Sequence, residues 1–329
     1  MKAGLPRSVE TMFSNIIQSL KPKGGAASTS PSELARLRKK DRAKLAKETI
    51  NKEIPIILKS NTRAANGVEN SEIIHYAPNA MPLTPALRHP PLQIQAASLR
   101  TAPATPETTA PRVRVIQSDT YDAAHALVKP SDSQVRVGVL NMASALRPGG
   151  GVLNGAVAQE ESICMRSTLY PSLKESFYRI PENSAIYSPD IVVFRNSDQQ
   201  DLPKAEWFYV DVISVAAVRE PDVVMRTKNG LNRMVYELEQ DYELMLMKAR
   251  LIMQIAKQKQ ISHLVLGALG CGVFRNPPEE VARIFERVIY GDRKRPGVVG
   301  IEEIVFAIYD DGPNLKAFRE IFESENSEE

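Results

Sequence analysis

The chain has 329 residues, of which 43% are hydrophobic and 25% charged, values typical of a soluble globular protein with one large domain or two small ones. It contains no run of about 18 or more apolar residues, which excludes an ordinary transmembrane helix, and its first residues lack the apolar stretch of a secretory signal. Two cysteines, Cys164 and Cys271, are too few for a disulfide framework, so we expect a reducing, intracellular setting.

The formal net charge of +3 is unevenly distributed. Residues 1–112 carry 17 Lys and Arg against 8 Asp and Glu, which leaves the rest of the chain acidic. Part of the excess lies in the basic stretch Arg36–Lys44. We favour its interpretation as the solvated face of a helix, while attraction to a polyanion or a nuclear-import signal remains an alternative.

The first third of the chain is expected to form an accessory region. Residues 1–31 are weakly patterned and predict a flexible N-terminus. Residues 32–75 predict an N-terminal helical extension, in which Ser32 caps a basic helix that runs to about Ile50. Residues 76–112 contain eight of the 23 prolines and therefore predict a linker or insertion.

Residues 113–329 have the alternating strands and helices of an α/β domain, with helices packed on a parallel or mixed sheet. The expected strands are 113–117, 135–140, 185–194, 208–217, 263–266 and 303–309, and the expected helices are 118–127, 232–257 and 277–290.

Two glycine-rich loops follow expected strands of this domain. Gly149–Gly151 comes after the strand that ends at Asn141, and Gly267–Phe274 comes after the strand at 263–266 and leads into the helix at 277–290. Ligands of open α/β sheets bind at the carboxyl ends of the strands. Backbone N–H groups in a glycine loop before a helix can bind a diphosphate without Lys or Arg, although each loop alone could be a structural turn.

Two adjacent carboxylates, Glu160 and Glu161, follow the first glycine loop. Side chains of consecutive residues point about 100° apart on a helix and in opposite directions on a strand. Glu160 and Glu161 therefore do not resemble the two facing carboxyl groups of ordinary glycosidases. One acid with a neighbour that orients substrate is one reading of the pair. The other is that Glu-Glu only opens the first turn of a helix.

The remaining polar residues indicate no further chemistry. The four histidines are scattered and predict no metal site, and nothing in the sequence calls for a cofactor. Cys271 has no nearby base and is expected to be a packing residue. Phe274 could stack on a ligand base or belong to the core.

These motifs resemble those of poly(ADP-ribose) glycohydrolases of the bacterial type, which also occur in fungi. The similarity lies in Gly149–Gly151 followed after seven residues by Gln159-Glu160-Glu161, and it extends from about Lys40 to Phe322. It includes the stretches Leu140–Ser144, Arg147-Pro148, Ile186–Pro189, Val193–Arg195 and Gly267–Phe274. The resemblance implies a macrodomain, with a three-layer α/β/α arrangement around a mixed sheet.

The resemblance further implies hydrolysis of the ribose–ribose O-glycosidic bonds of poly(ADP-ribose), with release of ADP-ribose from chain ends. Glu161 would be the general acid and base, and Glu160 would hold ribose hydroxyls. Gln159 would order the loop, and Ser144 stands where many macrodomains carry Asn. The implied substrate-binding residues are Asn141, Ser144, Gly149, Gly150, Gly151, Gln159, Gly270, Cys271, Gly272, Val273 and Phe274.

Two other functions are compatible with the sequence: an ADP-ribose-binding macrodomain without turnover, and a hydrolase of mono-ADP-ribosylated targets. The resemblance places the chain in the reversal of ADP-ribosylation, including the DNA damage response. We expect a monomer that binds ADP-ribosylated proteins and no specific nucleic acid sequence or membrane. Its expected location is the nucleus or cytoplasm of a eukaryote or the cytoplasm of a bacterium.

Overall fold

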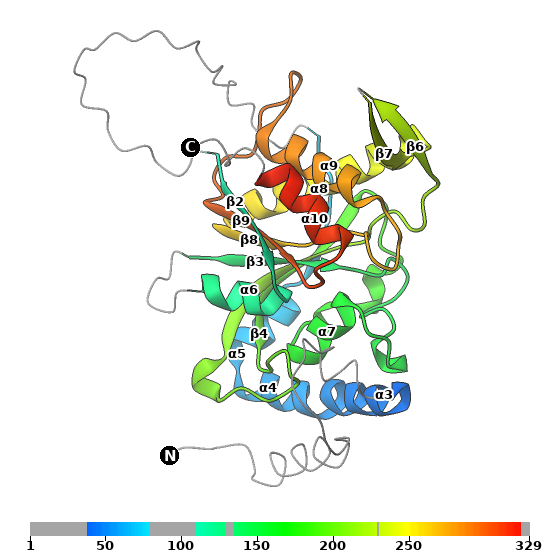
Figure 1. The fold of residues 1–329 in the computed structure, drawn as a ribbon. Coiled ribbons are helices and arrows are strands. Elements are labelled where there is room, and N and C mark those ends of the chain that lie inside the picture. Colours follow the sequence, from blue (N-terminus) through cyan, green and yellow to red (C-terminus); the bar gives the residue numbers. More distant parts are fainter. Residues whose placement is uncertain (1–37, 79–109, 129–134, 229, 324–329) are drawn as a thin grey trace, which may run out of the picture.

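The computed structural model describes residues 38–78, 110–128, 135–228 and 230–323 (Figure 1). The predicted flexible segment 1–31, the Ser32 cap and most of the predicted Pro-rich linker lie outside these residues. Within them, no helix combines the length and apolar character needed to cross a membrane.

A mixed seven-stranded sheet forms the centre of the protein, in the order β1-β4-β5-β3-β8-β9-β2. The five strands β5, β3, β8, β9 and β2 pair in parallel, whereas β4 and β1 are antiparallel to their neighbours. Their bounds are β1 Glu72–His75, β2 Arg112–Gln117, β3 Val137–Met142, β4 Ser184–Val193, β5 Phe208–Val215, β8 His263–Leu266 and β9 Glu303–Ile308. The central strands are largely buried along their whole length because both faces of the sheet are covered.

Helices pack on both faces of this sheet and complete the predicted three layers (Figure 1). On one face lie α8 (Glu239–Gln258), α9 (Pro278–Tyr290) and α10 (Pro313–Phe322). On the other lie α6 (Thr120–Leu127) and α7 (Gln159–Arg166). Short 3-10 turns occur at Val152–Asn154 (η3), Tyr170–Ser172, Glu175–Phe177 and Lys204–Glu206.

The described part of the predicted N-terminal extension consists mainly of helices. The helix α3 (Lys39–Glu48) ends close to the predicted Ile50. A π-helical turn, η1 (Thr49–Glu53), then leads into α4 (Ile54–Ser60), and α5 (Thr62–Glu69) follows. Strand β1, which falls in the predicted extension, pairs with β4 and forms one edge of the central sheet.

One predicted helix begins too early. The segment expected to be helical from Asn232 starts as a helix at Glu239, because residues 231–236 form strand β7 (Leu231–Tyr236). This strand pairs with β6 (Val223–Lys228) in a separate two-stranded sheet that projects from the domain (Figure 1). The sequence did not predict β6 or β7, nor did it predict α10 or β1.

Candidate active site

The carboxyl ends of β5, β3 and β8 meet at one edge of the sheet, as expected for neighbouring parallel strands. Met142 at the end of β3 lies against Gly267 at the end of β8, and a Cβ added at Gly267 would be 3.4 Å from its Cε. A Cβ added at Gly270 would lie 2.5 Å from Cβ of Ala217, which follows β5. Both glycine loops therefore reach the same side of the domain.

The first glycine loop folds back over the start of α7. Gly149 and Gly150 have φ of +59° and +57°, values in the left-handed region that favours glycine. A Cβ at Gly150 would lie 2.7 Å from Oε1 of Glu161 and 2.8 Å from Oε2 of Glu160. The two carboxylates, although about 100° apart around the helix, therefore converge on the backbone of one glycine.

Glu160 is only 4% exposed and is held by donors on β3 and the loop that follows it. Its Oε2 accepts a hydrogen bond from the backbone N–H of Ser144 at 2.8 Å, and Oε1 accepts one from Nδ2 of Asn141 at 3.4 Å. Burial raises the pKa of Glu160 to about 8; these hydrogen bonds oppose the rise, whereas the charge of Glu161 adds to it. Glu160 therefore carries a proton over much of the neutral pH range.

Glu161 is held in a different way. Its Oε1 accepts a hydrogen bond of 2.7 Å from the backbone N–H of Gly151. Its Oε2 is buried, and no described residue offers it a hydrogen bond. Buried polar atoms normally have a partner, so this oxygen is available to a bound ligand.

The neighbouring predicted site residues position these carboxylates. Gln159 spans from α7 to β3, where Oε1 accepts from the N–H of Met142 at 2.9 Å and Nε2 donates to the carbonyl of Leu140 at 2.7 Å. Ser144 contributes its backbone N–H to Glu160, while its hydroxyl accepts from the N–H of Leu146 at 3.2 Å. The hydrogen bond to Glu160 thus comes from the backbone of residue 144 and not from its side chain.

The second glycine loop, Gly267–Phe274, remains open on its outer side. Gly270 has φ of +75°, and a Cβ at Gly272 would meet no atom within 4 Å. Val273 is 73% exposed, whereas Cys271 and Phe274 are partly buried. Cys271 packs against the hydrophobic core on this face of the sheet, and burial raises the pKa of its thiol. The loop places exposed backbone beside α9, where a diphosphate could bind.

Sequence reasoning missed an asparagine that holds this second loop. Asn276 is 2% exposed, and its Nδ2 donates to the carbonyls of Val218 at 2.7 Å and Gly270 at 3.1 Å. Its Oδ1 accepts a hydrogen bond of 2.8 Å from the hydroxyl of Tyr236. The position of Asn276 directly after the loop was the available signal, but its partners lie in other segments of the chain.

Two further residues, one beside Asn141 and one close to Glu160, were also missed. The Ser214 hydroxyl on β5 accepts a hydrogen bond of 3.0 Å from Nδ2 of Asn141. The hydroxyl of Tyr178 is buried without a hydrogen-bond partner in the described ranges, and burial together with the charge of Glu160 raises its pKa. Neither residue belongs to a recognisable motif. The described residues also include no group of three or more His, Cys, Asp or Glu placed to hold a metal ion.

Comparison with known proteins relates this arrangement to one family. Residues 56–196, which include the first glycine loop and both carboxylates, match the family described as microbial-type PARG, catalytic domain. No curated protein matches the sequence.

Solved structures of poly(ADP-ribose) glycohydrolases (PARGs) are similar over most of this chain. The enzyme from Thermomonospora curvata is 26% identical, with a TM-score of 0.64 over 86% of this chain and 100% of that one. The Deinococcus radiodurans enzyme in complex with ADP-ribose is 27% identical, with a TM-score of 0.58 over 79% of this chain and 97% of that one. In a second crystal form the identity is 32% and the TM-score 0.54, over 66% of this chain and 86% of that one.

Proposed function

Because this chain belongs to the microbial-type poly(ADP-ribose) glycohydrolases, we propose that it hydrolyses the ribose–ribose O-glycosidic bonds of poly(ADP-ribose) and releases ADP-ribose. Structures of the Deinococcus radiodurans relative contain ADP-ribose, and one of the Thermomonospora curvata relative contains the inhibitor ADP-HPD, which supports an ADP-ribose site here. The observation that carries the proposal is the buried, unpartnered Oε2 of Glu161 beside Gly150 and Gly151.

In this proposal the two glycine loops bind the diphosphate of the terminal ADP-ribose unit. Gly149–Gly151 and Gly270–Val273 offer backbone close to a ligand, and Phe274 stacks on the adenosine end. Backbone dipoles fixed by the fold stabilise an anion with little rearrangement. The orphaned Oδ1 of Asn141, which is buried and accepts no hydrogen bond from the described residues, is then free to accept one from a ribose hydroxyl.

Glu161 is the proposed general acid and base. Its protonated carboxyl, with Oε2 facing the substrate, donates a proton to the departing ribose oxygen as the glycosidic bond breaks and an oxocarbenium ion develops. The resulting carboxylate then takes a proton from the water that attacks this ion. The hydrogen bond from Gly151 to Oε1 keeps the carboxyl in place during both steps.

Glu160 holds the ribose instead of acting as the acid. Both of its oxygens already accept hydrogen bonds, from Ser144 and Asn141, which leaves its geometry fixed. With its pKa raised to about 8, a neutral Glu160 can also donate a hydrogen bond to a ribose hydroxyl. In that state Glu160 adds no negative charge to the site, which eases the approach of the anionic substrate.

The proposal is tested by incubating the full chain with poly(ADP-ribose) and, separately, with mono-ADP-ribosylated protein. We expect free ADP-ribose from the polymer, and binding without turnover by Glu161→Gln. If neither wild type nor variant released ADP-ribose from the polymer but both still bound ADP-ribose, the chain would be a binding module and not an enzyme. Release only from the mono-ADP-ribosylated protein would assign the same site to a different substrate. Action as a monomer and an intracellular location remain predictions.

A further inference from the structure

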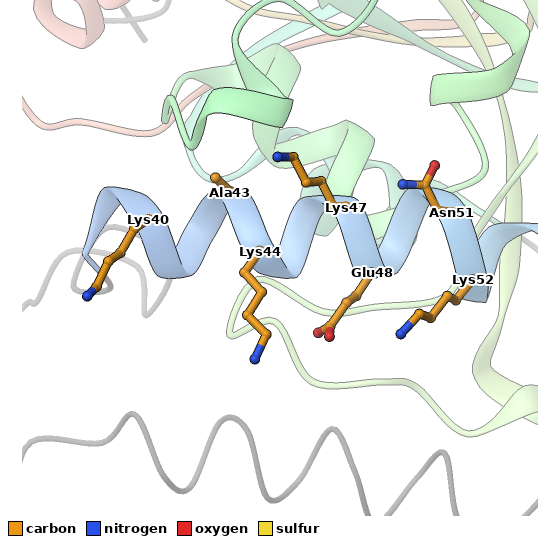
Figure 2. A pocket seen from close by; sticks show the side chains of 7 residues that line it. All are labelled: Lys40, Ala43, Lys44, Lys47, Glu48, Asn51 and Lys52. Atoms are coloured by element: carbon orange, nitrogen blue, oxygen red, sulfur yellow. The ribbon is translucent and has the colours of Figure 1, made fainter.

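A row of lysines lies on the exposed side of α3 and η1 (Figure 2). Lys40, Lys44 and Lys52 follow one another at helical spacings, with Glu48 between the last two, and Lys47 lies on the adjacent row. A hollow on this surface is lined by Lys40, Ala43, Lys44, Lys47, Glu48, Asn51 and Lys52. We call Lys40, Lys44 and Lys52 the lysine row.

The charge of this surface is nearly uncompensated. The three lysines of the row are exposed, and none forms an ion pair with a described residue. Two of the three acidic residues in α3 and η1 are already paired: Asp41 with Arg38 at 2.8 Å, and Glu53 with the buried Arg195 at 2.5 Å. Glu48 is therefore the single acidic side chain of these two elements that offsets the row.

The row begins beside the catalytic loop. Backbone atoms of Lys39 touch Gly155, where an added Cβ would collide with the Lys39 carbonyl, and Nε of Arg42 donates a hydrogen bond of 2.8 Å to the carbonyl of Gly155. Gly155 follows the turn η3, which continues directly from Gly151, the residue that holds Glu161. The first turn of α3 thus lies on the same loop that holds the acid.

We propose that the lysine row binds the diphosphates of the poly(ADP-ribose) chain that leaves the active site beyond the unit being cleaved. The bond that Glu161 breaks joins the bound unit to the rest of the polymer, so that remainder starts next to this loop. The row extends from Lys40 to Lys52, about 18 Å at 1.5 Å per residue. This inference rests on the proposed function and adds to it a binding surface outside the active site.

Electrostatic binding of a polyanion has a measurable signature. Each phosphate neutralised by a Lys releases counterions, so affinity falls steeply as salt rises, with a slope of roughly 0.7 per phosphate contact for single-stranded polymers. A surface that contributes three contacts should account for a slope of about 2. The proposal assigns ADP-ribose itself to the active site alone, so its affinity should not depend on the row.

The test uses the full chain in a Glu161→Gln background, so that binding is measured without hydrolysis. Lys40→Gln, Lys44→Gln and Lys52→Gln are combined, and the control combines Lys204→Gln, Lys294→Gln and Lys316→Gln, three exposed lysines elsewhere. We expect the first variant to bind long poly(ADP-ribose) roughly tenfold more weakly at physiological salt, with a shallower salt dependence. Its affinity for ADP-ribose and the polymer affinity of the control should be unchanged.

Glu48→Gln, which removes the opposing charge from the row, should change the polymer affinity in the other direction and strengthen it. If the lysine variant still bound ADP-ribose and its polymer affinity and salt dependence were unchanged, the proposed role of the lysine row would be wrong, while the proposed function would stand. Loss of both ligands by the Glu161→Gln parent would instead overturn the proposed function. An equal loss of affinity for duplex DNA of matched length would show a general polyanion surface and overturn the commitment to poly(ADP-ribose).

Discussion

At the scale of single residues, the two adjacent glutamates have different environments. Glu160 has a hydrogen-bond donor on each oxygen, whereas Glu161 has one occupied and one open oxygen. The difference arises because consecutive helical side chains reach different parts of the loop: Glu160 reaches Ser144 after β3, and Glu161 reaches Gly151. Unequal surroundings are what allow two like groups to take different roles.

The raised pKa of Glu160 predicts a pH dependence of stability. The folded state holds the Glu160 proton more tightly than the unfolded chain does, so this group stabilises the fold fully below pH 4.5, the ordinary pKa of a glutamate. That contribution is lost as pH rises toward the folded-state pKa of about 8. We expect the free energy of unfolding to decline between these pH values by an amount on the order of a few kcal/mol.

The measurement is denaturant unfolding at several pH values, with Glu160→Gln as the comparison. The variant cannot lose this proton, so its stability should be flatter over the same range. Identical pH profiles for the two proteins would show that Glu160 does not titrate in this window.

Gly150 provides a second prediction at this scale. In Gly150→Ala, the new Cβ would press against both carboxylates at 2.7 and 2.8 Å, and the alanine would have to adopt a φ of +57°. A displacement of catalytic groups by about 1 Å can cost about 100-fold in rate, so we expect at least that loss in kcat/KM on poly(ADP-ribose).

The matched control is Gly230→Ala, where φ is +76° but no atom lies within 4 Å of the new Cβ. It carries a similar backbone strain of about 1–2 kcal/mol without contact to the site. Activity of Gly150→Ala equal to that of this control would mean that the loop yields and that the carboxylates are not constrained by it.

At the scale of elements, the N-terminal helices are part of the catalytic domain. Arg195 after β4 is 1% exposed and donates to Oε2 of Glu53 at 2.5 Å, to Oγ1 of Thr49 at 3.0 Å and to the carbonyl of Met165 at 2.8 Å. Thr49 and Glu53 are the first and last residues of the π-helical turn η1, whereas Met165 lies on α7. One buried guanidinium therefore joins the helical extension to the helix of the two glutamates.

Removal of Glu53 should show how strongly these elements depend on each other. Glu53→Ala removes the buried carboxylate that pairs with the buried guanidinium of Arg195, and we expect a loss of about 3 kcal/mol in unfolding free energy. Glu320→Ala, which breaks the exposed pair with Lys316, should cost less than about 1 kcal/mol. A similar small loss for both variants in denaturant unfolding would mean that the extension is only loosely attached.

At the scale of the whole molecule, the sequence predicted the parallel part of the fold well. Buried strands such as β3 and β8 are largely apolar runs followed by glycine-rich loops, and these local features suffice to locate the site at the carboxyl edge of the sheet. The start of α8 was misplaced because the apolar pattern that predicts this helix begins only at Leu238, so the expected start at Asn232 rested on no periodic residue. The hairpin pairs only with itself, and most of β7 is exposed or partly buried, so no clear alternation marks it.

The site was less predictable than the fold because it depends on contacts between distant segments. The convergence of Glu160 and Glu161 requires the left-handed turn at Gly149 and Gly150, which spacing along the chain does not encode. Asn276 ties the second loop to Val218 and Tyr236, and those contacts exist only once β5, β7 and α9 are assembled. The residue types and their order in the sequence were enough to predict which residues belong to the site. The tertiary structure was needed to identify the hydrogen-bond partners of each.

The central claim is that Glu161 supplies the proton for bond cleavage while the rest of the site binds ADP-ribose. The most direct test is the rate of ADP-ribose release from poly(ADP-ribose) by Glu161→Gln, measured beside the affinity of the same variant for ADP-ribose. We expect turnover to fall by at least about 100-fold, as for loss of a general acid, with affinity within a few-fold of wild type. Turnover near the wild-type rate would contradict the assignment of Glu161 as the acid.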